Sequence, residues 1–181
     1  GLPVRQVISG EPQDLPNELR ALPCASGKQW EWDGVRFTLW HWSGATDSNQ
    51  NSCVLQIEAN GERLLLTGDI DARAERVLLD SPLAVSSHWL QAPHHGSRSS
   101  SSEAFVRALA PQGVLISRGH GNSFGHPHPQ VVERYQRLGV QIYDSAEHGA
   151  VRLLLGEFTA PQAMRRAARF WRSAPSVSPA P

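Results

Sequence analysis

The first third of the chain alternates apolar and polar residues in two blocks, each centred on a dipeptide that favours a tight turn. Alternation runs on both sides of Asp33-Gly34 in "QWEWDGVRFTLWHW" and on both sides of Asn60-Gly61 in "SCVLQIEANGERLLLTGD". A period of two is typical of β-strands, and these dipeptides supply the positive φ angles that a two-residue hairpin turn needs. The pattern therefore predicts two successive β-hairpins in an antiparallel sheet.

Helical and strand patterns alternate after Asp69. The second of three predicted helices has Ser101 or Ser102 as its N-cap, and the third has Pro129 in its first turn. Strands that alternate with helices indicate layered α/β structure. The predicted helices after Asp69 cover 72–80, 101–111 and 128–139, and the predicted strands cover 85–93, 113–119, "VQIYD" and "AVRLLLG". Before the hairpins, the sequence predicts a short strand at 4–9 and a helical stretch from Pro12 to Pro23.

Length and charge narrow the classes of protein. The 181 residues suffice for one domain with a core, and 17 basic residues balance 17 acidic ones. A balanced charge argues against a generally basic surface that coats nucleic acid, although a local basic groove stays open. No run approaches the ~18–20 apolar residues that span a bilayer. At the end, "PQAMRRAARFWR" (161–172) predicts a basic amphipathic helix, and "SAPSVSPAP" predicts a disordered tail.

Polar clusters follow three of the apolar strands. Such loops emerge at a sheet edge, where α/β proteins build their sites. A carboxylate with neutral imidazoles suits a divalent metal of the Zn²⁺ or Mn²⁺ type. The clusters are Asp69 in "LLLTGD", His94, His95 and Ser97 in "LQAPHHGS", and His120, Asn122 and His126 in "LISRGHGNSFGHPHP".

Each cluster also has a plainer interpretation. Asp69 or Asp71 could simply cap the helix that follows, and the pair His94-His95 could be surface residues. The histidines of 120–128 could be ordinary turn residues. The three clusters in this order indicate a functional site more specifically than any single cluster does. Two further histidines lie within strand patterns and are interpreted as structural: His41 and His88.

Over residues 1–156 the chain closely resembles the metallo-β-lactamase-like domain of the ComEC/Rec2 family, the DNA-internalisation proteins of bacterial competence. The resemblance rests on "LLLTGDID", "LQAPHHGSRSSSS", "LISRGHGNSFGHPHP" and "YDSAEHGAVRL" in that order, together with "NQNSCVL" (49–55). It implies an α/β fold, the metallo-β-lactamase αββα sandwich, of which this chain would hold the C-terminal portion. Residues 157–181 would then be a basic helix and a disordered tail.

The resemblance also implies roles for the clustered residues. Asp69 stands where the superfamily has its metal-bridging aspartate, and the HHG pair stands where it has its last metal-binding histidine. Because neighbouring residues that leave a strand point in opposite directions, one histidine would bind metal and the other would meet substrate or support the ligands; we favour His95 as the ligand. The candidate catalytic residues are Ser97 and, matching the family's substrate-facing "NxxGHP" segment, Asn122 and His126.

One family motif is absent from these 181 residues. The signature HxHxDH, which is HxDxDH in ComEC proteins, carries most ligands of a two-metal centre and does not occur here. Asp69 and one or two histidines are too few for a tight site. We therefore expect the C-terminal portion of a longer protein, with weak metal binding and no activity as an isolated chain.

The function implied for the complete domain is a metal-dependent phosphodiesterase, with two Zn²⁺ or Mn²⁺ ions, that degrades the DNA strand not imported during transformation. Its partners would be single-stranded DNA, a membrane channel segment of the same protein and the competence machinery. Its place would be the extracytoplasmic (periplasmic) face of the inner membrane. Alternatives are a catalytically silent binding or assembly module of the channel, or a hydrolase of another phosphoester.

The two cysteines, Cys24 and Cys53, have a spacing that fits no zinc knuckle. They could form a disulfide, which persists in oxidising compartments, or remain buried free thiols. The sequence leaves both open.

Overall fold

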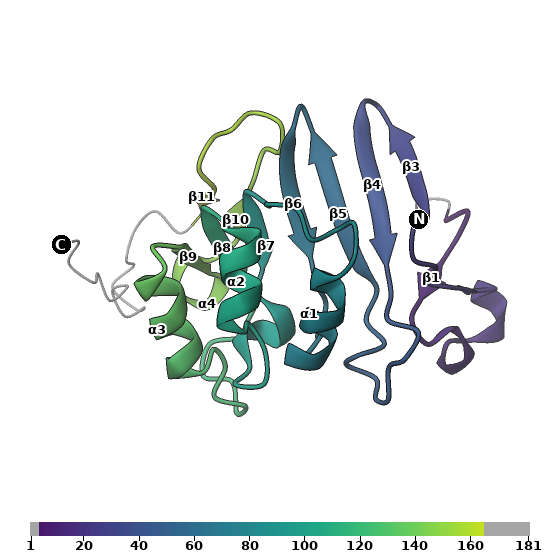
Figure 1. Cartoon of the computed structure of the whole chain (residues 1–181), viewed down its shortest axis with the longest axis horizontal. Helices are drawn as coiled ribbons and strands as arrows, with labels where there is room; N and C mark the ends of the chain where they lie inside the picture. Colours follow the sequence, from purple (N-terminus) through teal and green to yellow (C-terminus); the bar gives the residue numbers. More distant parts are fainter. Residues whose placement is uncertain (1–3, 165–181) are drawn as a thin grey trace.

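A seven-stranded sheet organises the computed structural model, which describes residues 4–164 (Figure 1). The strands pair antiparallel from β3 to β6 and parallel from β6 to β9, so the hairpin half and the α/β half predicted from the sequence share one sheet. In spatial order the strands are β3 (Gln29–Trp32), β4 (Val35–Trp40), β5 (Val54–Ala59), β6 (Glu62–Leu66), β7 (Trp89–Gln91), β8 (Gly113–Ile116) and β9 (Gln141–Asp144).

Both predicted hairpins are confirmed, with the expected turn residues. Trp32 pairs with Val35 across Asp33-Gly34, and Ala59 pairs with Glu62 across the second turn. All four turn residues have positive φ, from 49° at Asn60 to 82° at Gly61. The turn dipeptides thus fix the register of this half of the sheet.

Three helices cover one face of the sheet, at the predicted places (Figure 1). They are α1 (Ala72–Leu79), α2 (Glu103–Leu109) and α3 (Pro129–Arg137). Ser102 is the N-cap of α2. His128 is the N-cap of α3 and accepts from the Gln130 N–H at 3.3 Å, so one histidine of the 120–128 loop has a structural role.

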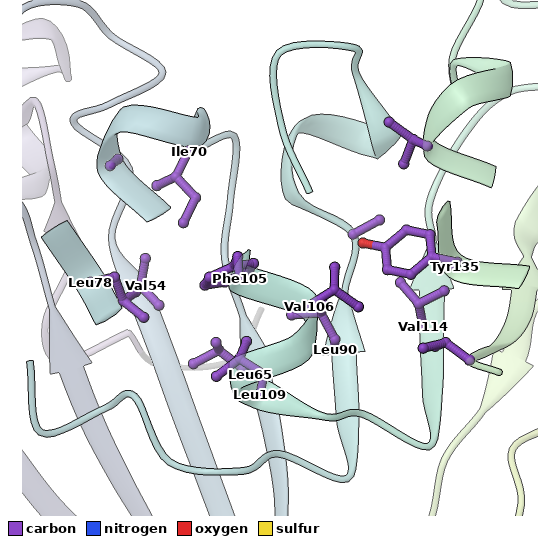
Figure 2. Packing of buried hydrophobic residues seen from close by; sticks show 14 of the residues in the cluster. Val54, Leu65, Ile70, Leu78, Leu90, Phe105, Val106, Leu109, Val114 and Tyr135 are labelled. Carbon is purple, nitrogen blue, oxygen red and sulfur yellow. The ribbon is translucent and has the colours of Figure 1, made fainter. Parts of the chain in front are cut away.

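The core lies between this face and the helices. Figure 2 shows Leu65 and Leu90, from two neighbouring strands, close to Phe105 and Leu109 of α2, whereas Val114, from the next strand, lies on the side of α3. All five side chains are fully buried. Each contributes about 1.5–3 kcal/mol relative to an exposed position.

The opposite face of the sheet is apolar but only partly buried. Leu39, Leu55 and Leu66 lie in register on it and line a cavity of about 400 Å³ together with Cys53. A sheet with helices on one face and an apolar second face has the layering of one half of an αββα sandwich.

Several predicted elements are shorter than the sequence indicates. The strand at 4–9 is reduced to β1 (Ile8–Ser9), which pairs in parallel with β2 (Leu22–Pro23), and the helical stretch is two 3₁₀ turns, Pro12–Asp14 and Asn17–Leu19. Strand 85–93 shortens to β7. Prolines and polar residues limit each of these runs.

The segment "AVRLLLG" forms only β10 (Val151–Arg152), paired antiparallel with β11 (Gln162–Ala163). The chain turns between them because the N–H groups of Gly156 and Phe158 donate to the Glu62 carboxylate. The first residues of the predicted helix 161–172 are therefore strand, and the rest of that helix and the predicted tail lie outside the described residues. None of the helices in 4–164 is long and apolar enough to cross a membrane.

Candidate metal and substrate site

The three polar clusters meet at one edge of the sheet, which we call the carboxyl edge because the parallel strands β6 to β9 all end there. This is the lower edge in Figure 1. Asp69 Oδ1 lies 3.6 Å from His95 Nε2, and the ring centroid of His94 lies 5.5 Å from that of His126. Parallel strands thus bring together residues that are up to 57 positions apart in the sequence.

Asp69 is held by Ser52, which lies seventeen residues earlier in the loop just before β5. Its N–H donates to Ser52 Oγ at 3.0 Å. Gly68 has φ of 58°, and a Cβ there would lie 2.8 Å from Ser52 Cβ, so only glycine permits this close approach. The serine of "NQNSCVL" therefore sets the position of Asp69.

Asp71, not Asp69, caps α1. Its Oδ1 accepts from the N–H groups of Arg73 and Ala74, and its Oδ2 accepts from Gln50 Nε2 at 2.9 Å. The plainer interpretation of the aspartates is thus correct for Asp71. The Asp69 carboxylate, 39% exposed, stays available for the site.

His94 and His95 lie in a left-handed turn rather than an extended continuation of β7. Their φ angles are 48° and 56°, within the 3₁₀ segment Pro93–Gly96. The reason given for unequal roles, opposite directions along an extended chain, is therefore wrong. The rings still diverge, with centroids 6.4 Å apart. A non-glycine residue in this conformation costs about 1–2 kcal/mol, and such strain is typical of functional loops.

The tautomer of His95 follows from its partner. Nδ1 lies 2.7 Å from the Ser117 carbonyl oxygen, which can only accept, so Nδ1 carries the hydrogen. In the neutral ring Nε2 then presents a lone pair to Asp69 Oδ1. Two acceptors that face each other at 3.6 Å need a shared cation or proton between them. Two ligands of one tetrahedral Zn²⁺, each bound at about 2.0–2.2 Å, lie about 3.3–3.6 Å apart, so the pair fits a metal.

His94 and His126 bring further unused nitrogens to the edge. The Nδ1 atom of each ring is buried and has no hydrogen-bond partner among the described residues. Burial lowers the pKa of His126, and the neighbouring His94 and His95 lower it further, while Asp69 acts in the opposite direction. His126 is therefore a neutral imidazole at neutral pH, with a nitrogen able to accept a proton or bind a ligand.

The pair Asp69–His95 alone does not make a closed metal site. Within residues 4–164, no group of three or more His, Cys, Asp or Glu side chains is arranged to hold an ion. The described part of the chain therefore supplies two fitting ligands and fewer than the three protein ligands that catalytic zinc sites keep.

Asn122 and Ser97 make hydrogen bonds within their own loops. Asn122 Nδ2 donates to the His126 carbonyl oxygen at 2.7 Å, and Asn122 Oδ1 accepts from the His126 N–H at 3.1 Å. Ser97 is buried and its Oγ lies 3.2 Å from Ser99 Oγ. In this arrangement both side chains orient the loops that carry the histidines.

Comparison with known families agrees with this geometry. The family model described as "Metallo-beta-lactamase superfamily" matches residues 25–120, more than half of the chain. The chain belongs to the metallo-beta-lactamase superfamily. The expected fold is thereby confirmed.

Relatives named as a competence protein and a recombination protein confirm the resemblance to the ComEC/Rec2 family. Competence protein ComA of Neisseria gonorrhoeae is 34% identical over 158 residues, which cover 86% of the chain and 22% of that protein. The uncharacterized protein YcaI of Escherichia coli is 37% identical over 70% of the chain and 17% of its own length. Recombination protein 2 of Haemophilus influenzae is 32% identical over 72% of the chain and 16% of its length. The chain thus spans about a fifth of these relatives.

A cavity of about 320 Å³ opens beside the Asp69–His95 pair. His95, Asn122, Phe124 and His126 line it, together with Arg118. Arg118 Nε donates to Asp144 at 2.6 Å, and its other nitrogen to Glu147 at 3.1 Å. Asp144 and Glu147 of the "YDSAEHG" segment therefore fix the position of Arg118 in the cavity wall.

The sequence analysis did not identify Glu75, which holds the serine run that follows His94-His95. Glu75 of α1 is fully buried and accepts from the N–H groups of Ser101 and Ser102. Tyr135 donates to Ser101 Oγ at 2.9 Å, and Ser101 has φ of 55°. The signal was present, because Glu75 interrupts the apolar stripe of α1 between Ala74 and Leu78.

Proposed function

We propose that this chain is part of a DNA-uptake protein and that its superfamily domain hydrolyses phosphodiester bonds in DNA with the aid of a divalent metal, Mn²⁺ or Zn²⁺. The observation that carries the proposal is the pair of acceptors, Asp69 Oδ1 and His95 Nε2, that face each other at 3.6 Å. The names of the relatives, a competence protein and a recombination protein, support DNA as the substrate.

The residues divide the work as follows. His95 presents Nε2 because the Ser117 carbonyl holds its other nitrogen, and Asp69 is fixed through Ser52. A bound ion would activate water and neutralise charge on the phosphate. His126 lines the cavity with a nitrogen able to accept a proton, so it would take the proton of the attacking water and then give that proton to the leaving oxygen. Asn122 and Ser97 keep these loops in place.

The proposal also covers the remaining metal ligands, the binding partners and the cellular location. Further ligands of the HxDxDH type would come from outside the described residues. Single-stranded DNA, a membrane channel segment and the competence machinery are the proposed partners. The periplasmic face of the inner membrane is the proposed location.

Mn²⁺-dependent cleavage of a fluorescent single-stranded oligonucleotide tests the proposal. The protein should include any residues that precede Gly1, so that a complete ligand set is present. We expect Asp69→Asn and His95→Ala each to slow cleavage by about 100-fold or more, since even residues that only support ligands cost 10–100-fold. Asp80→Asn, an exposed aspartate at the end of α1, is the control and should retain wild-type rates. Equal rates in Asp69→Asn and Asp80→Asn would refute the assignment.

A second function, a silent DNA-binding module, is favoured by the absence of a three-ligand group among residues 4–164. It predicts DNA binding that is unaffected by Asp69→Asn, with no cleavage at any Mn²⁺ concentration. The same assay therefore separates the two functions.

A further inference from the structure

An exposed aromatic ring stands at the rim of the cavity beside the Asp69–His95 pair. Phe124 is 80% exposed, more than any other large apolar side chain in residues 4–164. Its ring lies over the ring of His126, with centroids 6.1 Å apart and 25° between the planes. Keeping a phenylalanine in water forgoes about 1.5–3 kcal/mol of burial. Folding of the described residues therefore does not explain the ring's position.

The cavity under this ring is suited to a flat, uncharged group. Its volume of about 320 Å³ is near the lower limit of ligand pockets, about 300–1,000 Å³, and is too small for a duplex. Arg118 lies in the wall, but its guanidinium is bound by Asp144 and Glu147, so its charge is already neutralised. Stacking, rather than a free positive charge, is what this wall offers a ligand.

Aromatic rings connect the rim to the metal-binding pair. Phe124 lies over His126, His126 lies 5.5 Å from His94, and His95 lines the same cavity as Phe124. A ligand that stacks on Phe124 therefore extends towards the side where His95 faces Asp69. A base that stacks with its sugar on that side brings its own phosphate towards Asp69 and His95.

We propose that Phe124 is a stacking platform for one base of a single-stranded nucleic acid, with the attached phosphate directed towards Asp69 and His95. The choice of a nucleic acid and the direction of its phosphate rest on the proposed function, while the exposed ring and the cavity for a flat group do not. Duplex DNA is excluded as the occupant, since its base faces are covered by neighbouring pairs. Base–aromatic stacking tolerates any sequence, because every base has a π-face.

Binding to two oligonucleotides of equal length tests the platform directly. One is a fluorescent oligothymidylate of about 12 nucleotides, within the range of single-strand sites, and the other has the same backbone without bases. Anisotropy is measured on the whole chain in EDTA, so that no cleavage occurs. We expect Phe124→Ala to weaken oligothymidylate binding about tenfold, to leave binding of the abasic strand unchanged, and Phe124→Trp to restore the affinity.

Phe158→Ala is the matched control. Phe158 is 57% exposed and packs edge-on against His88 at the opposite edge of the sheet, so its loss should not change either affinity. Thermal unfolding of each variant separates loss of fold from loss of stacking. An unchanged oligothymidylate affinity in Phe124→Ala, or a wild-type chain that binds both strands equally, would overturn the platform.

The outcome is distinct from that of the proposed function. Phe124-dependent binding without any Mn²⁺-dependent cleavage would keep the platform and refute the phosphodiesterase. Hydrolysis of bis(p-nitrophenyl) phosphate, a diester without a base, together with base-independent binding would do the reverse.

Discussion

Strands end at both edges of the seven-stranded sheet, but the polar groups at the two edges differ in how fully they are hydrogen-bonded. At the edge opposite the carboxyl edge, which we call the turn edge, two-residue turns close the hairpins and Glu62 is saturated by Trp89 Nε1 and by the N–H groups of Gly156 and Phe158. At the carboxyl edge, Asp69 and His95 face each other as two acceptors, and the Nδ1 atoms of His94 and His126 have no hydrogen-bond partner within residues 4–164. The turn edge stabilises the fold, and the carboxyl edge retains unsatisfied chemistry for a ligand.

The largest expected effect comes from breaking the turn edge. Glu62→Ala removes the acceptor of one buried donor, Trp89 Nε1, and of two partly buried N–H groups, so we expect the free energy of unfolding to fall by about 3–5 kcal/mol, the range for removing one partner of a buried charged group. Urea unfolding at pH 7 measures it. Glu58→Ala on the neighbouring strand is the control: Glu58 pairs with Arg36 and Arg63 at a partly exposed position, and its loss should cost about 1 kcal/mol or less. Similar losses in the two variants would remove the distinction between the edges.

The carboxyl edge should respond in the opposite direction. In Asp69→Asn the side-chain amide can donate to His95 Nε2, which replaces two facing acceptors by a hydrogen bond. We expect the free energy of unfolding to rise by about 1 kcal/mol, the typical net contribution of one such bond. Urea unfolding in EDTA at pH 8 checks this against Asp80→Asn. A clear destabilisation would mean that the Asp69–His95 pair already stabilises the fold without a ligand.

The stability contributed by two buried glutamates, Glu62 and Glu75, depends on pH in opposite ways. Burial raises the pKa of Glu62, but hydrogen bonds from Trp89, Phe158 and Gly156 outweigh burial and bring it below 4.5. Burial raises the pKa of Glu75 above 4.5 despite its hydrogen bonds from Ser102 and Ser101. The stability that Glu62 contributes is thus present above pH 4.5 and lost as the pH falls through its lowered pKa. The contribution of Glu75 is present below pH 4.5 and lost as the pH rises through its raised pKa.

The free energy of unfolding, measured from pH 3 to pH 8, distinguishes the opposite pH dependences expected for Glu62 and Glu75. The deficit of Glu62→Gln relative to wild type should shrink towards low pH. The stability of Glu75→Gln relative to wild type should increase with pH. Parallel curves for both variants would contradict the opposite shifts.

The smallest expected effect concerns the thiols near the carboxyl edge. Both cysteines are free in the structure. A hydrogen bond from the Cys24 thiol lowers the pKa of Cys53, while the same contact and burial raise that of Cys24. We expect iodoacetamide to alkylate Cys53 first, and Cys24→Ala to slow that reaction a few-fold at pH 7.5, because the thiolate is the nucleophile. Mass spectrometry of the alkylated peptides measures both rates.

The alternative of a disulfide is tested in the same sample. Thiol titration of unfolded, unreduced protein from an oxidising compartment should find two thiols if the cysteines stay free and none if they are joined. Alkylation of Cys24 before Cys53 would contradict the assigned pKa shifts.

Elements with local signals were predictable from the sequence. Asp33-Gly34 and Asn60-Gly61 fixed both hairpins because their turn conformation is a property of those dipeptides. The α2 and α3 helices began where a serine cap and Pro129 indicated. The convergence of Asp69 with His95 was predictable from strand ends alone.

Features that depend on distant partners were not predictable. Only Gln50 and Ser52, from an earlier segment, decide that Asp71 caps the helix and that Asp69 faces the site. The left-handed turn at His94 and His95 has no local signature, since neither residue favours positive φ as glycine does. The early end of β10 depends on Glu62, a partner almost a hundred residues earlier.

That last contact has a consequence for synthesis on the ribosome. Glu62 lies 94 positions before Gly156 and 96 before Phe158. Closing a loop of this length costs about 4 kcal/mol of chain entropy. A nascent chain that has exposed the whole sheet but not residues 156–158 leaves the Glu62 carboxylate without the N–H donors of Gly156 and Phe158. The domain therefore completes its fold only after that turn has left the exit tunnel, and a translational pause just before it would hold an unfinished domain.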